Sequence, residues 1–226
     1  MKNGKAAEAD NIPAEVLKVD PYISADILLP LFQDIWQTET FPKEWKEGII
    51  VKVPKKGDLS QCRNWRGVTL LAVISKILNK VMLERIKNSL EMGLRKEQAG
   101  FYQDRSCIDQ INTLRVITEQ SVEFQSLHYV LFVDYQRSFD PLNRARIWDK
   151  LKVRGLPRKF INIIKEGYED FNCRVLHENQ VSDSIKMSSG VQQGCLLSPL
   201  LFLLVMDGVL CRALDGKKRG LTWRLR

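Results

Sequence analysis

The sequence contains no Cys-x-x-Cys pair, and its only two histidines complete no zinc-ligand pattern with a cysteine. A structural zinc site is therefore not expected, because such sites take their four ligands from closely spaced Cys and His residues. The five cysteines are scattered and odd in number, and no secretory signal is visible. We expect reduced thiols in an intracellular, non-secreted protein, with nucleus and cytoplasm left open.

Long apolar runs are scarce as well. The stretch from Leu196 to Leu210 is shorter than the roughly 20 residues that span a bilayer, and Pro199 and Asp207 interrupt it. It predicts a buried core helix, and no membrane partner is expected. Repeats, low-complexity segments and obvious linkers are also missing, so the 226 residues are expected to form one large core or two small ones.

Negative charge is in the minority. The chain has 35 Lys and Arg against 27 Asp and Glu, which gives a formal net charge of +8. Such an excess is compatible with a polyanionic partner, since each phosphate contact releases condensed counterions. Many basic proteins bind no nucleic acid, so charge alone leaves both readings open.

Apolar periodicity predicts a mixed α+β fold class. Helices are expected over residues 23–38, 72–91, 108–124, 144–154 and 157–168, after Gly194, and near Pro13, where Asn11 can act as the cap. Strands are expected over residues 48–54, 128–134, 173–176 and 184–187. Residues 128–134 are almost all apolar until they reach Asp134, which is typical of a buried strand.

Two segments carry candidate chemistry. In Phe132 to Asp140 (FVDYQRSFD), Asp134 follows an apolar strand and supplies the hard oxygen ligand that Mg²⁺ prefers. The alternative is a solvent-facing or helix-capping aspartate. In the segment that begins at Ser189 (SGVQQGCLLSP), two glycines flank glutamines just before a helix, which lets the backbone approach a ligand closely.

In this order, the two segments resemble blocks of the reverse transcriptases of non-long-terminal-repeat (LINE-type) retrotransposons. The first is similar to the family's F-x-D-x-x-x-A-F-D block, and the second to G-V-R-Q-G-C-x-L-S-P. Upstream, CRNWRGVTLLAVISKILNKVMLERI and KEQAGFYQDRSCIDQI resemble the fingers block and the block after it. VPKKGD and GKAAEADNIPAEVLK match more weakly, so the resemblance runs from about Gly4 to the C-terminus.

The resemblance implies a right-hand polymerase fold. It divides the chain into an N-terminal helical extension (residues 1–45) and a reverse transcriptase domain (46–226), with fingers at about 46–125 and a partial palm at about 126–226. The implied activity is RNA-templated DNA synthesis by two-metal nucleotidyl transfer. The implied partners are an RNA template, a DNA primer and dNTPs, with oligomeric state left open.

Residue roles follow where the blocks match. Asp134 would bind Mg²⁺, one of two ions in the family, with the backbone of Tyr135 beside it. Nucleotide-binding positions are Arg66, Lys55, Lys56, Phe139, Gln193 and Gly194, and Arg105 matches a template-path position. The Phe139 ring would exclude a 2′-hydroxyl. Structural roles are the alternatives: Phe139 could be a core aromatic and the two lysines part of a solvated turn. Asp140 could be a structural cap or an ion-pair partner.

The sequence also departs from the family pattern. No Asp-Asp pair occurs, so the Y/F-A-D-D block is absent, and residues 217–226 resemble only the approach to it. The catalytic hairpin and thumb are expected to be missing, which predicts an inactive chain. Gln192 replaces the usual arginine, Tyr102 and Asp104 alter the G-F-R-x-G-R-S block, and GKAAEAD replaces G-K-A-P-G-x-D. A non-catalytic RNA/DNA-binding remnant and an unstable pseudogene fragment are therefore alternatives.

Overall fold

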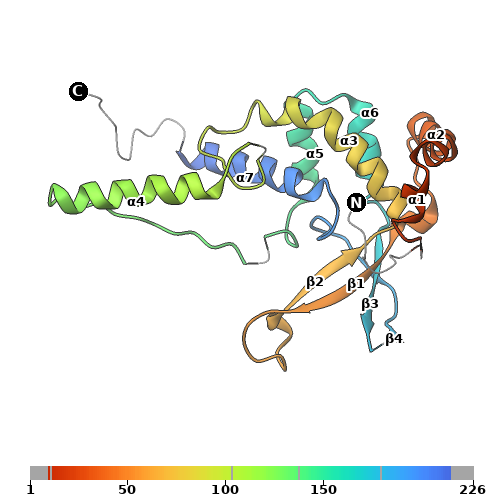
Figure 1. The fold of residues 1–226 in the computed structure, drawn as a ribbon, viewed down its shortest axis with the longest axis horizontal. Coiled ribbons are helices and arrows are strands. Elements are labelled where there is room, and N and C mark those ends of the chain that lie inside the picture. Colours follow the sequence, from red (N-terminus) through yellow and green to blue (C-terminus); the bar gives the residue numbers. More distant parts are fainter. Residues whose placement is uncertain (1–9, 11, 103, 137, 179, 215–226) are drawn as a thin grey trace.

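The computed structural model describes residues 10, 12–102, 104–136, 138–178 and 180–214 (Figure 1). In this part of the chain, helices and one mixed sheet form an α+β fold, which confirms the expected class. The expected cap Asn11 and the segment 217–226 lie outside the described residues.

The helices match the apolar periodicity of the sequence. They are α1 (Val16–Val19), α2 (Pro21–Thr38), α3 (Val73–Glu91), α4 (Cys107–Glu123), α5 (Arg144–Val153), α6 (Arg158–Glu166) and α7 (Ser198–Leu214). Side-chain caps fix several starts: Asp20 accepts the N–H groups of Tyr22 and Ile23 at 2.9 and 3.0 Å, and Ser106 accepts that of Ile108 at 3.0 Å. The expected helix boundaries are therefore confirmed to within a few residues.

The sheet joins segments that are far apart in the sequence. Its strands are β1 (Glu47–Pro54), β2 (Trp65–Leu70), β3 (Asn172–His177), β4 (Gln180–Val181) and β5 (Ile185–Lys186). The order is β2-β1-β3-β4, and β5 also pairs with β3. β1 and β2 are antiparallel, whereas β1 and β3 are parallel, with Ile50 opposite Val175. Two short 3₁₀ helices, Lys43–Lys46 and Cys62–Asn64, precede β1 and β2.

The core lies among the helices next to the sheet. α3, α5, α6 and α7 contribute fully buried side chains, among them Leu90, Leu151, Ile163 and Leu201. A buried ion pair ties this layer together, because Arg154 Nη2 lies 2.5 Å from Asp207 Oδ2. Burial of a charge needs such a partner, so the pair fixes α5 against α7.

The expected buried strand over residues 128–134 is not present. This segment is extended and unpaired, and Leu131 and Phe132 are 86% and 79% exposed. A strand needs a neighbour to accept and donate its backbone hydrogen bonds, and no strand of the described residues lies beside it. The prediction was wrong for this reason, although the apolar character of the segment was identified correctly.

α4 shares this exposure. It projects from the body of the molecule, and the extended segment runs back from its far end (Figure 1). None of its residues is buried. Across the described residues, no helix has the length and apolar content that a membrane crossing requires.

Candidate nucleotide-binding site

Gln193 connects two of the segments that the sequence singled out. Its carbonyl oxygen accepts the N–H of Thr69, in β2, at 2.6 Å. Its side-chain amide donates to Asp140 Oδ1 at 2.8 Å. The structure therefore brings the end of the aspartate block, the glutamine turn and the fingers strand together around one residue.

Two glycines allow this close approach. Gly194 has φ +138°, and a Cβ there would lie 2.2 Å from the carbonyl oxygen of Thr69. Gly190 has φ +74°, and its Cβ would lie 2.4 Å from the carbonyl oxygen of Asp140. Both positions therefore require glycine, for its left-handed backbone and for its lack of a side chain.

Phe139 lies beside this turn and is half-buried. Its ring stacks on that of Phe202 in α7, with centroids 5.0 Å apart, and meets Phe101 edge-on at 6.5 Å. Aromatic contacts of this kind hold a ring in a fixed orientation. They satisfy the plain reading of Phe139 as a packed aromatic, and they would also hold the ring rigidly against a ligand.

The basic candidates lie on the β1–β2 hairpin. Lys55 and Lys56 are exposed where the connection leaves β1, and Arg66 is exposed in β2 opposite Val53. Lys55 Nζ donates to the carbonyl oxygen of Arg63 at 3.2 Å. The hairpin therefore presents exposed cations to solvent, as a phosphate-binding surface requires.

The connection between β1 and β2 is internally ordered. Asp58 accepts the backbone and side-chain hydrogen bonds of Ser60, which lower the pKa of its carboxyl group, and Gln61 adds a third bond. Trp65 Nε1 donates to the carbonyl oxygen of Leu59 at 2.9 Å. These hydrogen bonds order the connection at the tip of the hairpin, so the exposed cations there are held on an ordered backbone.

Asp134 and Tyr135 lie in the extended, exposed segment before the turn that carries Phe139. The carbonyl oxygen of Tyr135 accepts the hydroxyl of Ser138 at 3.1 Å. Among the residues that the structure describes, no group of three or more His, Cys, Asp or Glu side chains is placed to hold a metal ion. Within that part of the chain, Asp134 therefore stands as one carboxylate without the additional ligands of a metal centre.

Arg105 points back onto its own segment. Its Nη1 donates to the carbonyl oxygens of Arg95, Lys96 and Gln98 at 3.3, 2.5 and 2.9 Å. The guanidinium also lies 4.1 Å from the ring centroid of Tyr102. These contacts order the segment between α3 and α4, and a template contact by Arg105 stays a prediction.

Gln192 is turned away from Gln193. Its amide donates to the carbonyl oxygen of Gly167, at the end of α6, at 2.9 Å. The sequence identified Gln192 only as a replacement of the family's usual arginine, and the structure directs its side chain to the C-terminal end of α6. An arginine there would find favourable partners in the same carbonyl groups.

A buried polar group supports the turn from behind. Tyr168 Oη lies 3.2 Å from Ser198 Oγ, in the first residue of α7. Burial raises the pKa of Tyr168 well above its ordinary value, and burial also raises the pKa of the Cys195 thiol. Both groups are therefore neutral at physiological pH and act as packing and hydrogen-bonding support.

Sequence reasoning missed Arg144, which binds the carbonyl oxygens of Ser189 and Gly190 in this turn and that of Tyr168 after α6. One signal was available: a cation at the first position of a helix opposes the helix dipole. Such a residue is expected to have another partner.

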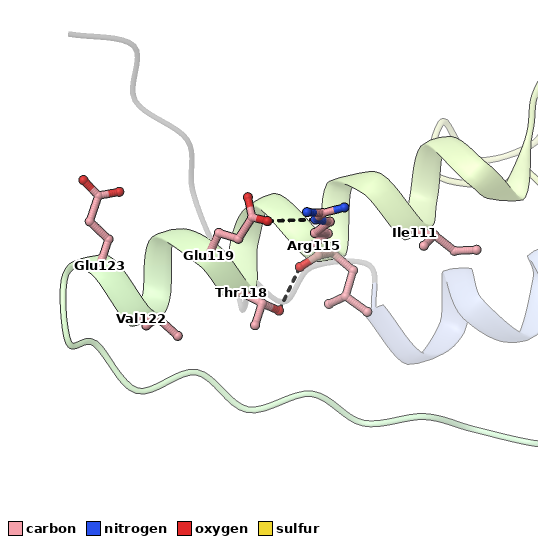
Figure 2. A pocket seen from close by; sticks show the side chains of 7 residues that line it. Ile111, Arg115, Thr118, Glu119, Val122 and Glu123 are labelled. Carbon is pink, nitrogen blue, oxygen red and sulfur yellow. Dashed lines mark hydrogen bonds and ion pairs between the residues drawn. The ribbon is translucent and has the colours of Figure 1, made fainter.

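A largely apolar groove lies elsewhere, along α4 (Figure 2). Ile111, Thr118 and Val122 line it together with Arg115 and Glu119, which form an ion pair of 2.8 Å. None of the candidate site residues lines this groove. It is therefore a separate feature from the contacts around Gln193.

Residues 53–220 match the reverse transcriptase (RNA-dependent DNA polymerase) family, and the chain belongs to that family. The matched region includes β2, the Phe139 turn, Gln193 and α7.

The relatives are proteins of non-long-terminal-repeat retrotransposons. The Pol polyprotein of retrotransposable element R2DM from Drosophila melanogaster is 26% identical over 83% of this chain and 18% of its own length. The probable RNA-directed DNA polymerase of transposon X-element from Drosophila melanogaster is 29% identical over 90% of this chain and 23% of its own length. The RNA-directed DNA polymerase of mobile element jockey, from the same organism, is 23% identical over 88% of this chain and 22% of its own length. The chain spans about a fifth of the length of these curated relatives.

Proposed function

We propose that residues 1–226 form the fingers and part of the palm of a retrotransposon reverse transcriptase. In this proposal they supply the nucleotide-binding side of RNA-templated DNA synthesis. One observation carries the proposal: Gln193 bonds both to Thr69 of β2 and to Asp140, next to Phe139, within the region that matches the family.

Each candidate residue then has a role suited to its place. Arg66, Lys55 and Lys56 contact the triphosphate from the exposed hairpin, since solvent-exposed cations can bond phosphate oxygens directly. Phe139 contacts the sugar, and its ring excludes a 2′-hydroxyl because Phe202 holds it from behind. Gln193 and Gly194 contact the incoming nucleotide, and Arg105 lies along the RNA template.

Mg²⁺ does not fit the described residues by themselves. Asp134 offers one exposed carboxylate, whereas Mg²⁺ sites in nucleotidyl transfer combine several oxygen ligands. No Asp-Asp pair occurs anywhere in the 226 residues. We therefore propose that residues 1–226 do not extend a primer until further carboxylates are supplied.

A second function is favoured by the charge of the chain. With a net charge of +8 and exposed cations on the β1–β2 hairpin, residues 1–226 are suited to bind RNA or DNA without catalysis. Such binding would weaken steeply with salt and would be accompanied by no dNTP incorporation.

Primer extension with matched nucleotides tests the leading proposal. A polypeptide that continues through the downstream reading frame is given an RNA template, a DNA primer and either dCTP or CTP. Incorporation of dCTP in preference to CTP, with CTP incorporation raised in Phe139→Ala, is the expected result. RNA binding without incorporation by this longer chain would favour the second function, and unchanged sugar preference in Phe139→Ala would contradict the role of the ring.

A further inference from the structure

Arg144 begins α5 and binds three backbone carbonyl oxygens. Its Nε donates to Gly190 O at 3.0 Å, its Nη1 to Tyr168 O at 2.8 Å and its Nη2 to Ser189 O at 3.2 Å. The guanidinium also lies 5.3 Å from the ring centroid of Tyr168. Only the planar fork of arginine reaches three acceptors in this geometry, since a lysine ammonium is a point charge on a flexible stem.

The position of this cation is unfavourable unless its contacts compensate for it. Arg144 is half-buried, and burial lowers the pKa of its guanidinium. It also lies at the N-terminal end of a helix, where the dipole repels a positive charge. Three carbonyl oxygens offset both effects, so the side chain is tied to one place.

The carbonyl oxygens of Ser189 and Gly190 belong to a turn docked on Phe139. In that turn, the Gly190 N–H donates to Leu142 O and the Val191 N–H donates to Phe139 O, both at 2.9 Å. Arg144 therefore holds one side of the turn while the Phe139 segment holds the other. Gln193 lies two residues beyond Val191, so a shift of the turn would change the separation between Gln193 and the Phe139 ring.

We propose that Arg144 is a positioning residue for nucleotide selection. By clamping Ser189 and Gly190, it fixes Gln193 relative to the Phe139 ring and thereby sets the preference for deoxyribonucleotides over ribonucleotides. This inference rests on the proposed nucleotide-binding role of Phe139 and Gln193.

Equilibrium binding of dCTP and CTP to the full chain tests the inference, because the two ligands differ only at the 2′-hydroxyl. The wild-type chain is expected to bind dCTP more tightly. Arg144→Ala should lower the ratio of the CTP to the dCTP dissociation constant roughly tenfold, because the released turn no longer holds Gln193 at a fixed distance from the Phe139 ring. Arg146→Ala is the matched control, an exposed arginine of the same helix, and should leave the ratio unchanged.

Arg144→Lys keeps the positive charge but lacks the planar guanidinium, and the same binding measurement is made on this variant if Arg144→Ala does not fold. Hydrogen exchange at the Gly190 and Val191 amides gives a second readout, since both should exchange faster in either Arg144 variant. A merely structural Arg144 would lower thermal stability and leave the dCTP/CTP ratio unchanged, which would overturn the inference. A wild-type chain that does not discriminate dCTP from CTP would overturn the proposed function and this inference together.

Discussion

Replacing Gly190 with alanine should be costly because the residue has both a left-handed backbone and a backbone neighbour. At φ +74°, alanine pays roughly 1–2 kcal/mol for its conformation. Its Cβ would also lie 2.4 Å from Asp140 O and 2.6 Å from Phe139 O, so the turn must move. That movement breaks the two backbone hydrogen bonds of the turn to Leu142 and Phe139, each worth about 1 kcal/mol.

Gly155 provides a matched control within the chain. It has the same φ of +74°, but a Cβ there meets nothing within 4 Å. Gly155→Ala therefore carries the conformational strain alone, and the stiffening of the unfolded chain is the same for both variants. The difference between the two variants isolates the docking of the turn.

Urea unfolding of the chain measures this difference. Gly190→Ala should lose about 3–4 kcal/mol of unfolding free energy and Gly155→Ala about 1–2 kcal/mol, leaving a gap of about 2 kcal/mol. Equal losses in the two variants would refute the reasoning, because the turn would then not be held against the Phe139 segment.

Three further results are expected. Burial raises the pKa of Cys173 from 9.0 to about 11, so between these pH values the folded chain binds more protons than the unfolded chain. The free energy of unfolding should therefore fall by up to about 2–3 kcal/mol as pH rises through that window, and by less in Cys173→Ala. Asp207→Ala should lose about 3 kcal/mol in urea unfolding, because it leaves the Arg154 guanidinium without its buried partner. Replacing Lys55 and Lys56 with alanine should weaken RNA binding and reduce its salt slope by about 0.7 for each phosphate that is no longer neutralised, as a titration at several salt concentrations would show.

The helices were predictable because their information is local. In α3, the buried side chains Leu78, Met82, Ile86 and Leu90 recur at helical spacing, and the helix was expected within one residue of its observed start. Spacing of this kind is visible in any single sequence, since the residues that share a face are only three or four positions apart.

The sheet was less predictable because its pairings are not local. The parallel register places Glu47 to Val51 beside Asn172 to Leu176, and nothing in either segment specifies the other. β2 (Trp65–Leu70) was missed for the same reason. The strand predicted over residues 128–134 is absent for a different reason. Its apolar residues indicate burial, but a strand also needs a neighbouring strand, and residue type does not show whether one is present.

The candidate site divides along similar lines. The resemblance assigned Phe139, Gln193 and Gly194 to nucleotide binding, which stays a prediction, and the structure places Gln193 against Asp140, next to Phe139. The inward direction of Gln192 and the clamp by Arg144 were not foreseen, because both depend on where the end of α6 lies in the fold.

We propose that Asp134 is a metal ligand of a polymerase site whose other carboxylates are not all present in residues 1–226. Primer extension on an RNA template with Mg²⁺ tests it directly, with residues 1–226 and a chain that continues through the downstream frame compared side by side. No extension by residues 1–226, and extension by the longer chain that Asp134→Ala abolishes, is the predicted result. Extension by residues 1–226 alone, or extension by the longer chain that survives Asp134→Ala, would contradict the claim.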